Sequence, residues 1–580
     1  MVYIFKLMIS TNFNLLPSSS SILPESLSPL HMFLEPVAEY EPSVQFNKTI
    51  FQIPKCPHCC SYYNSNCKME SDFWECSVCG SKVHYVKAIP CDALKGDIID
   101  VQQKENNNSF DFTLAIMIDD DQYRIPVKEI VLEYSKMMKE DDTFTFYYKK
   151  EDDITIDISE DIESQFEDIE LNNQKATYKG VEGKVKSIIK DLNTYGRCVI
   201  VMPAPDDTDN LDSLIKVLKT HQKKMRIDFY FVCSDLSYKF ESESLPKLLD
   251  AAPGLIRTFR VCDDLPELKS YLLDDFSCDF AFDIFVEFKN IEGNYKIEYS
   301  SHNYLSEKIM DSLIYVPVLP SDQVSLGFLI TPPDEPYNFD TKTFQFLIKY
   351  IKWNAETHKF TDNIRIINQK YDITSSTSEL IKNIIHSTTV YSWARKAQEL
   401  PLNRIRDFII EQIINNNKLI LENTEFIPLL LLAFDYLHNS LSKGTIWSRI
   451  TSNTTFFISS PKAFSSILNY SVEVWKDQNT LIKTIENLKP EEIDRDYIYV
   501  IKSCPLIQIL SSDGNVVIHE GTKMEQSIKK YIKDCKPFNV SLTNNDLRDT
   551  SLLQIFVEEG LDNLLRESKL ESLSSHFGLN

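Results

Sequence analysis

Apolar runs alternate with amphipathic patterns in the first half of the chain. Continuous apolar runs, typical of parallel strands buried on both faces, occur at 112–118, 199–202 and 227–233. Apolar residues at helical spacing follow each run, from Val127 to Met138, from Leu211 to Leu218 and from Leu245 to Leu249. This alternation predicts a doubly wound α/β layer with a parallel sheet.

The apolar period changes to two at Phe280. One face of a strand is expected to carry Phe280, Phe282, Ile284, Val286 and Phe288, and the opposite face Ala281, Asp283, Phe285 and Glu287. Further short strands at 295–299, 315–318, 324–330 and 344–351 predict an antiparallel β-sandwich. Helical spacing dominates from about 376 to 450. Strands at 497–501, 507–510 and 516–519, followed by helices at 524–532 and 552–565, predict a small α+β module at the end.

Two Cys-x-x-Cys knuckles form the strongest chemical signal. They consist of Cys56 with Cys59 and Cys76 with Cys79, and sixteen residues separate them. This spacing is typical of a tetrahedral four-thiolate zinc site, in which sulfur fills every coordination position. We therefore expect structural zinc that fixes neighbouring modules at a set angle. The alternative is four unrelated buried cysteines. His58, Cys60 and Cys67 lie nearby but do not form a second knuckle pair, so they are placed outside the ligand set.

The composition indicates a large, acidic, globular protein. A length of 580 residues predicts roughly three to five structural units. Thirteen cysteines without a disulfide-like pattern favour a reducing compartment. The net charge of −24 argues against nonspecific nucleic-acid binding, although residues 140–170 alone carry thirteen acidic residues against Lys149 and Lys150. We interpret that acidic stretch as a solvated loop.

Catalytic signatures are missing from the sequence. It has no glycine-rich phosphate loop, no nucleophile elbow and no HExxH motif. Asp119, Asp120 and Asp121 follow the first predicted strand, where an α/β sheet binds ligands. A metal-dependent adhesion site would need hydroxyl ligands where Asp121 and Tyr123 stand, so a strand-end turn is the preferred interpretation. The apolar residues 1–9 lack the features of a signal peptide, and no run of about 18 apolar residues predicts a membrane span.

Short collinear motifs make the chain similar to the inner-coat subunits of coat protein complex II (COPII), the Sec-twenty-three and Sec-twenty-four families. Asn14–Ser19 resembles an Asn-x-x-Pro-Ser-Ser element of the Sec-twenty-three type, and Asn64, Cys67 and Trp74 fit its ribbon. Further matches are Asp228–Leu236, Val316–Gln323, Phe344–Tyr350 with Arg365, Trp393–Arg395 and Leu552–Phe556. The resemblance is closer to the Sec-twenty-three type, in a divergent and shortened form.

The resemblance implies a multidomain α/β plus β protein. Its expected parts are an N-terminal extended arm packing on the β-sandwich (1–45), a four-Cys zinc ribbon (46–90), a von Willebrand A-like α/β trunk (91–275), the β-sandwich (276–375), a helical domain (376–490) and a gelsolin-like domain (491–580).

The resemblance also implies partners and a location. They are a Sar-type small GTPase, a cargo-adaptor coat subunit, outer-coat subunits and peripheral contact with the cytosolic face of the endoplasmic reticulum and of COPII vesicles, in transport from the endoplasmic reticulum to the Golgi. The chain would act as a structural subunit rather than an enzyme. The segment that carries the family's arginine finger is not recognisable between 534 and 549. The resemblance therefore implies GTPase binding more directly than GTPase activation.

Two other functions are compatible with parts of the sequence. A cargo-selecting adaptor of the Sec-twenty-four type would have the same architecture, but the Asn14–Ser19 element and Cys67 disfavour it. A zinc-ribbon nucleic-acid binder would stack bases on ribbon aromatics such as Tyr62 and Trp74 beside Lys55 and Lys82. The acidic balance and the expectation that these aromatics pack the ribbon itself argue against it.

Overall fold

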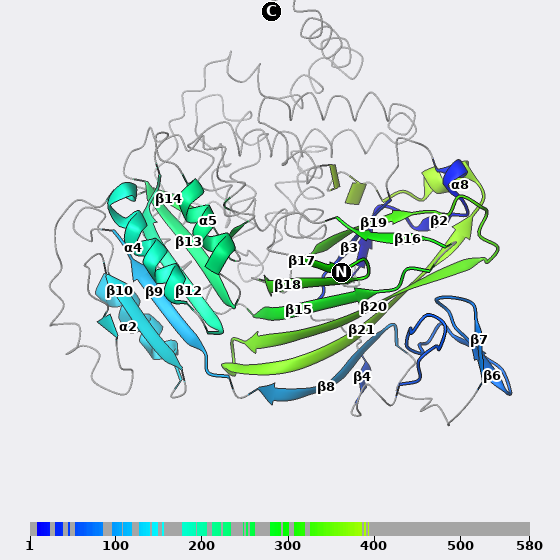
Figure 1. Cartoon of the computed structure of the whole chain (residues 1–580), viewed down its shortest axis with the longest axis horizontal. Helices are drawn as coiled ribbons and strands as arrows, with labels where there is room; N and C mark the ends of the chain where they lie inside the picture. Colours follow the sequence, from blue (N-terminus) through cyan, green and yellow to red (C-terminus); the bar gives the residue numbers. More distant parts are fainter. Residues whose placement is uncertain are drawn as a thin grey trace, which may run out of the picture.

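The computed structural model places an α/β domain, a β-sandwich and a small ribbon along one long axis (Figure 1). It describes residues 9–23, 30–38, 44–46, 53–84, 96–106, 108–118, 127–139, 142–148, 154–155, 177–192, 194–205, 211–221, 224–233, 248, 251–252, 254, 256–260, 279–291, 294–300, 307–319, 325–385, 388–389 and 392–393. The predicted helical and gelsolin-like domains therefore lie almost wholly outside the described residues. The same holds for Asp119 to Asp121, for the arginine-finger segment and for most of the helix expected at 245–249.

The α/β domain has the doubly wound parallel sheet expected from the sequence. Numbered by their order within the domain, its strands follow the order 3-2-1-4-5-6, and only the edge strand β11 runs antiparallel to its neighbour. In sheet order the strands are β11 (Ile154–Thr155), β10 (Thr143–Tyr148), β9 (Asp111–Ile116), β12 (Gly196–Pro203), β13 (Met225–Cys233) and β14 (Ile256–Arg260).

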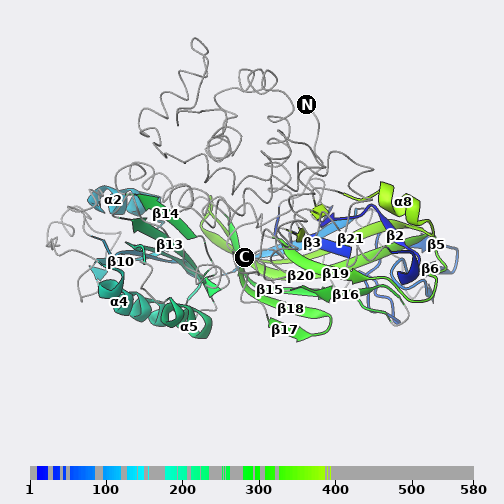
Figure 2. The ribbon, with the colours of Figure 1, turned by 90° about the horizontal axis from the view of Figure 1, so that it is seen from above.

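Helices cover both faces of this parallel sheet. The helix α2 (Val127–Met137) lies on one face, and α4 (Tyr178–Asp191) and α5 (Asp212–His221) lie on the other (Figure 2). The central strands β9, β12 and β13 contribute side chains to two separate apolar clusters, one beneath each helical layer. Burial on both faces is why these strands are continuous apolar runs in the sequence.

Two strands of the sheet, β10 and β11, lie within the acidic stretch that the sequence analysis interprets as a solvated loop. Strand β10 pairs in parallel with β9 and buries Phe144, Phe146 and Tyr148. The interpretation was wrong for these residues. The charge was counted over the whole stretch, and the many flanking acidic residues hide the pattern of a strand only six residues long.

The β-sandwich consists of two sheets that enclose one apolar core. The smaller sheet contains β1 (Ile9–Thr11), β3 (Leu30–Leu34), β19 (Leu326–Thr331) and β16 (Lys296–Tyr299). The larger contains β17 (Glu307–Met310), β18 (Leu313–Leu319), β15 (Phe280–Phe288), β20 (Thr341–Asn354), β21 (Lys359–Thr374), β8 (Ile98–Asn106) and β4 (Val44–Phe46), with β2 (Leu15–Pro17) added beside β21.

N-terminal residues supply strands to both sheets. The resemblance motif at Asn14–Ser19 forms β2, and its Ser18 amide donates to the carbonyl of Thr374 at 2.8 Å. A short 3₁₀ turn, η1 (Ser20–Ile22), follows it. Helix α8 (Thr377–Lys382) begins after the sandwich, and the Ser376 hydroxyl caps it by accepting from the Glu379 amide. None of the helices in the described part of the chain has the length and apolar character needed to cross a bilayer.

Strand β15 changes faces at Asp283, which corrects the predicted alternation. A register shift lies between Phe282 and Phe285, and Asp283 has a φ of 47°. Before the shift, Phe280 and Phe282 pack toward the α/β domain. After it, Ile284, Val286 and Phe288 pack in the sandwich core, together with Ala281, which the sequence placed on the opposite face. An uninterrupted period of two could not reveal this bulge.

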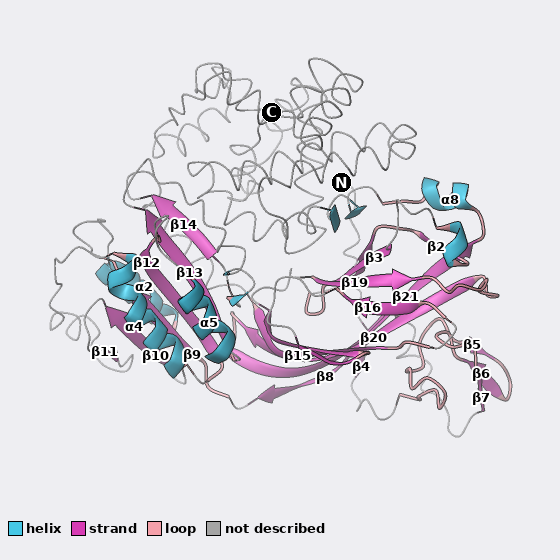
Figure 3. Ribbon diagram, turned by 45° about the horizontal axis from the view of Figure 1, so that its top comes forward, coloured by secondary structure: helices cyan, strands magenta, loops and turns pink. Residues whose placement is uncertain are grey.

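The joint between the α/β domain and the sandwich is aromatic and buried. Phe110, just before β9, stacks on Trp353 of β20 with ring centroids 4.4 Å apart, and Phe280 lies 5.0 Å from Trp353. At its edge, Asp142 contacts His358 Nδ1 at 2.7 Å. These contacts fix the α/β domain to the turn of the β20–β21 hairpin (Figure 3).

Truncation of Trp353 is expected to weaken this joint. The substitution Trp353→Ala removes a fully buried ring, and such changes typically cost about 3–5 kcal/mol. The matched control is Phe285→Ala in the neighbouring strand, where the ring is 36% exposed and the cost should be about 1 kcal/mol or less. Urea unfolding followed by tryptophan and tyrosine fluorescence measures both. Equal midpoints for the two variants would contradict the assignment of this joint.

Candidate metal centre

The ribbon is built from two knuckles of the same backbone design, next to the short strands β5 (Lys68–Met69), β6 (Phe73–Glu75) and β7 (Lys82–His84). In the first knuckle the Cys60 amide donates to the Cys56 carbonyl at 2.9 Å. In the second, the Gly80 amide donates to the Cys76 carbonyl at 2.7 Å. Both turns place the residue after the second cysteine at positive φ, 58° at Cys60 and 74° at Gly80. The turns direct the cysteine side chains toward one another.

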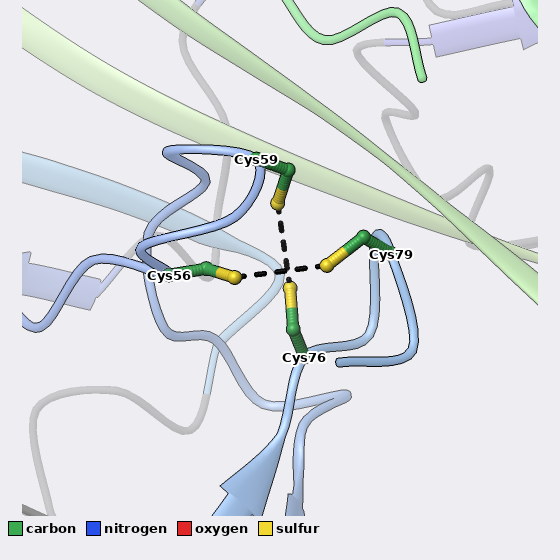
Figure 4. Close-up of side chains that lie close together, drawn as sticks. All are labelled: Cys56, Cys59, Cys76 and Cys79. Carbon is green, nitrogen blue, oxygen red and sulfur yellow. Dashed lines mark hydrogen bonds between the residues drawn. The ribbon is translucent and has the colours of Figure 1, made fainter. Parts of the chain in front are cut away.

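The structure brings the four predicted ligands together. The sulfurs of Cys56, Cys59, Cys76 and Cys79 all lie within 4.8 Å of one another and point to a common centre (Figure 4). The Cys56–Cys79 and Cys59–Cys76 sulfur distances are 3.6 and 3.7 Å. Cys56 and Cys76 are buried, and the other two are half-buried. In the described part of the chain, this is the one cluster of histidine, cysteine and acidic residues found to suit a metal ion.

The donor set fits zinc. Four sulfurs at about 2.3 Å from a central ion would form a tetrahedron with edges of about 3.8 Å, close to the separations found here. Burial raises the pKa of Cys56 to about 11, whereas the hydrogen bond with Cys59 raises the pKa of Cys76 and lowers that of Cys79. Metal binding would require all four thiols to lose their protons. Since all four donors converge on one point, none of the positions is left for a substrate.

Three further candidate ligands near the knuckles lie outside the sulfur cluster. His58 and Cys60 are exposed. Cys67 is buried, its sulfur lies 3.8 Å from the Ser77 hydroxyl, and burial raises its pKa. These three residues are not part of the group of four cysteines.

A serine close to two of the sulfurs was missed at the sequence level. Ser61 is fully buried, and its hydroxyl lies 3.0 Å from the Cys59 sulfur and 3.1 Å from the Cys76 sulfur. Its counterpart Ser81 forms hydrogen bonds with Cys79. The signal was present, because both knuckles have the form Cys-x-x-Cys-x-Ser.

The ribbon docks on the outer face of the larger sandwich sheet. Tyr62 and Trp74 join an apolar cluster with Ile99 of β8, Leu347 of β20 and Ile366 of β21. Polar contacts reinforce it: the Tyr62 amide donates to Gln345 Oε1 at 2.6 Å, Gln345 Nε2 donates to the Tyr62 carbonyl at 2.8 Å, and Lys342 Nζ donates to the Val78 carbonyl at 2.7 Å.

The expectation that the ribbon fixes the angle between neighbouring modules needs correction. Among the described residues, its cluster and hydrogen bonds lead to the sandwich, whereas the α/β domain is held by the separate aromatic joint at Phe110 and Trp353. The ribbon therefore stabilises one sheet rather than the angle between the two larger domains.

Three of the ribbon aromatics are buried and so are not available for stacking bases. Tyr62, Tyr63 and Trp74 are buried, with exposed fractions of 5%, 9% and 2%. Tyr63 packs edge-on against Trp74 at 5.3 Å between centroids. This agrees with the interpretation that the aromatics pack the ribbon itself.

Comparison with solved structures identifies a known fold for this chain. No family model and no curated protein matches the sequence. The structure is similar to the human COPII-coat protein Sec24c, with a TM-score of 0.58 and 13% identity over 80% of this chain and 76% of that one. The chain shares the fold of that coat protein.

Two weaker structural likenesses were also found. One is to VWA2, the ArnB paralog from Sulfolobus acidocaldarius, with a TM-score of 0.34 and 13% identity over 60% of this chain and 91% of that one. The other is to a von Willebrand factor type A protein from Catenulispora acidiphila, with a TM-score of 0.35 and 12% identity over 56% of this chain and 82% of that one.

The second knuckle should tolerate only glycine at position 80. A Cβ on Gly80 would lie 3.0 Å from Phe339 Cζ at a φ of 74°, so Gly80→Ala should lower stability by about 1–2 kcal/mol. The matched change is Cys60→Gly, which places glycine at the corresponding position of the first knuckle and should leave stability unchanged or raised. Thermal unfolding measures both. An unchanged Tm for Gly80→Ala would contradict the strained backbone.

Proposed function

We propose that the chain is a structural subunit of a COPII-type inner coat, acting in transport from the endoplasmic reticulum to the Golgi. The observation that carries this proposal is the fold shared with the human COPII-coat protein Sec24c over 80% of the chain. The collinear sequence motifs add support, since they run in the same order as the parts of the coat subunits. A scaffold needs large rigid surfaces rather than a pocket, and several domains packed on one sandwich provide them.

We propose that Cys56, Cys59, Cys76 and Cys79 hold one structural zinc ion. The sulfur separations and the lack of a fifth donor in the cluster support this assignment. The ion would close the ribbon that packs on β20 and β21, with no role in chemistry. We also propose the division of the chain at 45, 90, 275, 375 and 490, except that β8, counted with the α/β trunk in that division, belongs to the larger sandwich sheet.

The subunit type remains a choice between two proposals. The Asn14–Ser19 element favours the Sec-twenty-three type, which would bind a Sar-type GTPase, a cargo-adaptor subunit and outer-coat subunits on the cytosolic face of the endoplasmic reticulum. The structural likeness to Sec24c favours the cargo-selecting adaptor as the second candidate. Of these two subunit types, only the Sec-twenty-three type would activate the GTPase.

Replacing one ligand should remove the metal. We expect Cys76→Ser to lose zinc and to expose the ribbon to proteases, because three sulfurs bind the ion far more weakly than four. The exposed Cys60→Ser variant should keep one zinc per chain. Elemental analysis of the purified variants measures the metal content. Equal zinc content in the two variants would refute the ligand assignment.

Recruitment to membranes tests the coat function. The full chain should bind liposomes of endoplasmic-reticulum lipid composition when a GTP-locked Sar-type GTPase is present, and should not bind with the GDP form. Sedimentation with the liposomes measures this, and stimulated GTP hydrolysis in the presence of the chain would identify the Sec-twenty-three type. Cargo-tail peptide binding without GTPase binding would select the adaptor, and an absence of both would refute the coat assignment.

A further inference from the structure

Lys342 is a buried ammonium group close to the cysteine cluster. It lies near the start of β20, and the residue is only 3% exposed. Its Nζ donates to the carbonyl of Val78, which lies between the third and fourth cysteines in the sequence, and stands 5.8 and 5.9 Å from the ring centroids of Tyr337 and Phe344. Fully buried lysines are rare unless an anion accompanies them.

Lys342 lies beside the second knuckle, where its Nζ contacts the Val78 carbonyl between Cys76 and Cys79. No ion pair joins it to a carboxylate of the described residues. Burial lowers the pKa of Lys342 to about 8, and charge on Cys59, Cys79 and Cys76 opposes that change. Four thiolates around a divalent ion carry a net charge of about −2. A buried dianion of this kind needs nearby positive charge, just as the buried ammonium needs an anion.

We propose that Lys342 is the counter-charge of the metal centre and couples zinc occupancy to docking of the ribbon on the sandwich. The inference rests on the proposed four-sulfur zinc site. Lys342 is a positioning residue: it stabilises the thiolates and holds the second knuckle by its Val78 carbonyl. Loss of the metal removes the charge that makes burial of Lys342 favourable, so the empty ribbon should leave the sheet.

A charge role differs from simple packing in its pH dependence. The variant Lys342→Met keeps an unbranched side chain and removes the charge, so protons should compete better for the thiolates. The matched control is Gln345→Met, which removes the neutral hydrogen bonds that dock the first knuckle through Tyr62. Both variants weaken docking, but only Lys342→Met should change the charge balance of the centre.

The test is zinc release from the full chain to a chromophoric chelator across a pH series. We expect Lys342→Met to release zinc about tenfold faster than wild type, with its acid-release midpoint moved to higher pH. Gln345→Met should keep the wild-type midpoint. Identical midpoints in Lys342→Met and wild type would overturn the inference. Wild-type protein without stoichiometric zinc would instead refute the metal site itself.

A second measurement needs no variant. Amine acylation of wild-type protein, read by mass spectrometry, should leave Lys342 unmodified when zinc is bound and modify it after the metal is stripped. The exposed Lys349 of the same strand should be modified in both states and serves as the internal control. Equal protection of Lys342 with and without the metal would overturn the coupling.

Discussion

The β20–β21 hairpin is the constraint on which the described structure depends. Its two strands pair continuously from Thr341 and Asp372 to Asn354 and Lys359 at the turn. Near the open end, Gln345 and Leu347 receive the ribbon. At the turn, Trp353 and His358 receive the α/β domain. Strand β2 of the N-terminal segment pairs with β21, and β15 pairs with β20. One hairpin thus sets the positions of parts that are far apart in the sequence.

The metal centre and the domain joint are stabilised by different interactions. The ribbon is too small to bury a core of its own, so it relies on four clustered sulfurs and on the sandwich face. The joint between the larger domains relies on stacked aromatic rings and on Asp283, whose carboxylate accepts hydrogen bonds from Tyr195 of the α/β domain and Tyr315 of the sandwich. Both arrangements are closed by packed side chains.

Local sequence patterns predict many of the strands and the sulfur cluster. The features that the sequence does not reveal depend on contacts between residues far apart in the chain. Continuous apolar runs predict β9, β12 and β13, and the cysteine spacing predicts the sulfur cluster. The face change at Asp283 depends on which domain each half of β15 meets, which periodicity does not encode. Lys342 and Gln345 lie more than 250 residues from the knuckles they contact, so no local signal marks them.

We propose that a closed four-sulfur zinc centre holds the ribbon on the hairpin of a scaffold protein. X-ray absorption spectroscopy at the zinc edge of the purified full chain tests the claim most directly. The account predicts one zinc per chain with four sulfur neighbours at about 2.3 Å and no oxygen or nitrogen neighbour. An open position filled by water, a mixed sulfur and nitrogen shell, or protein that carries no zinc would contradict it.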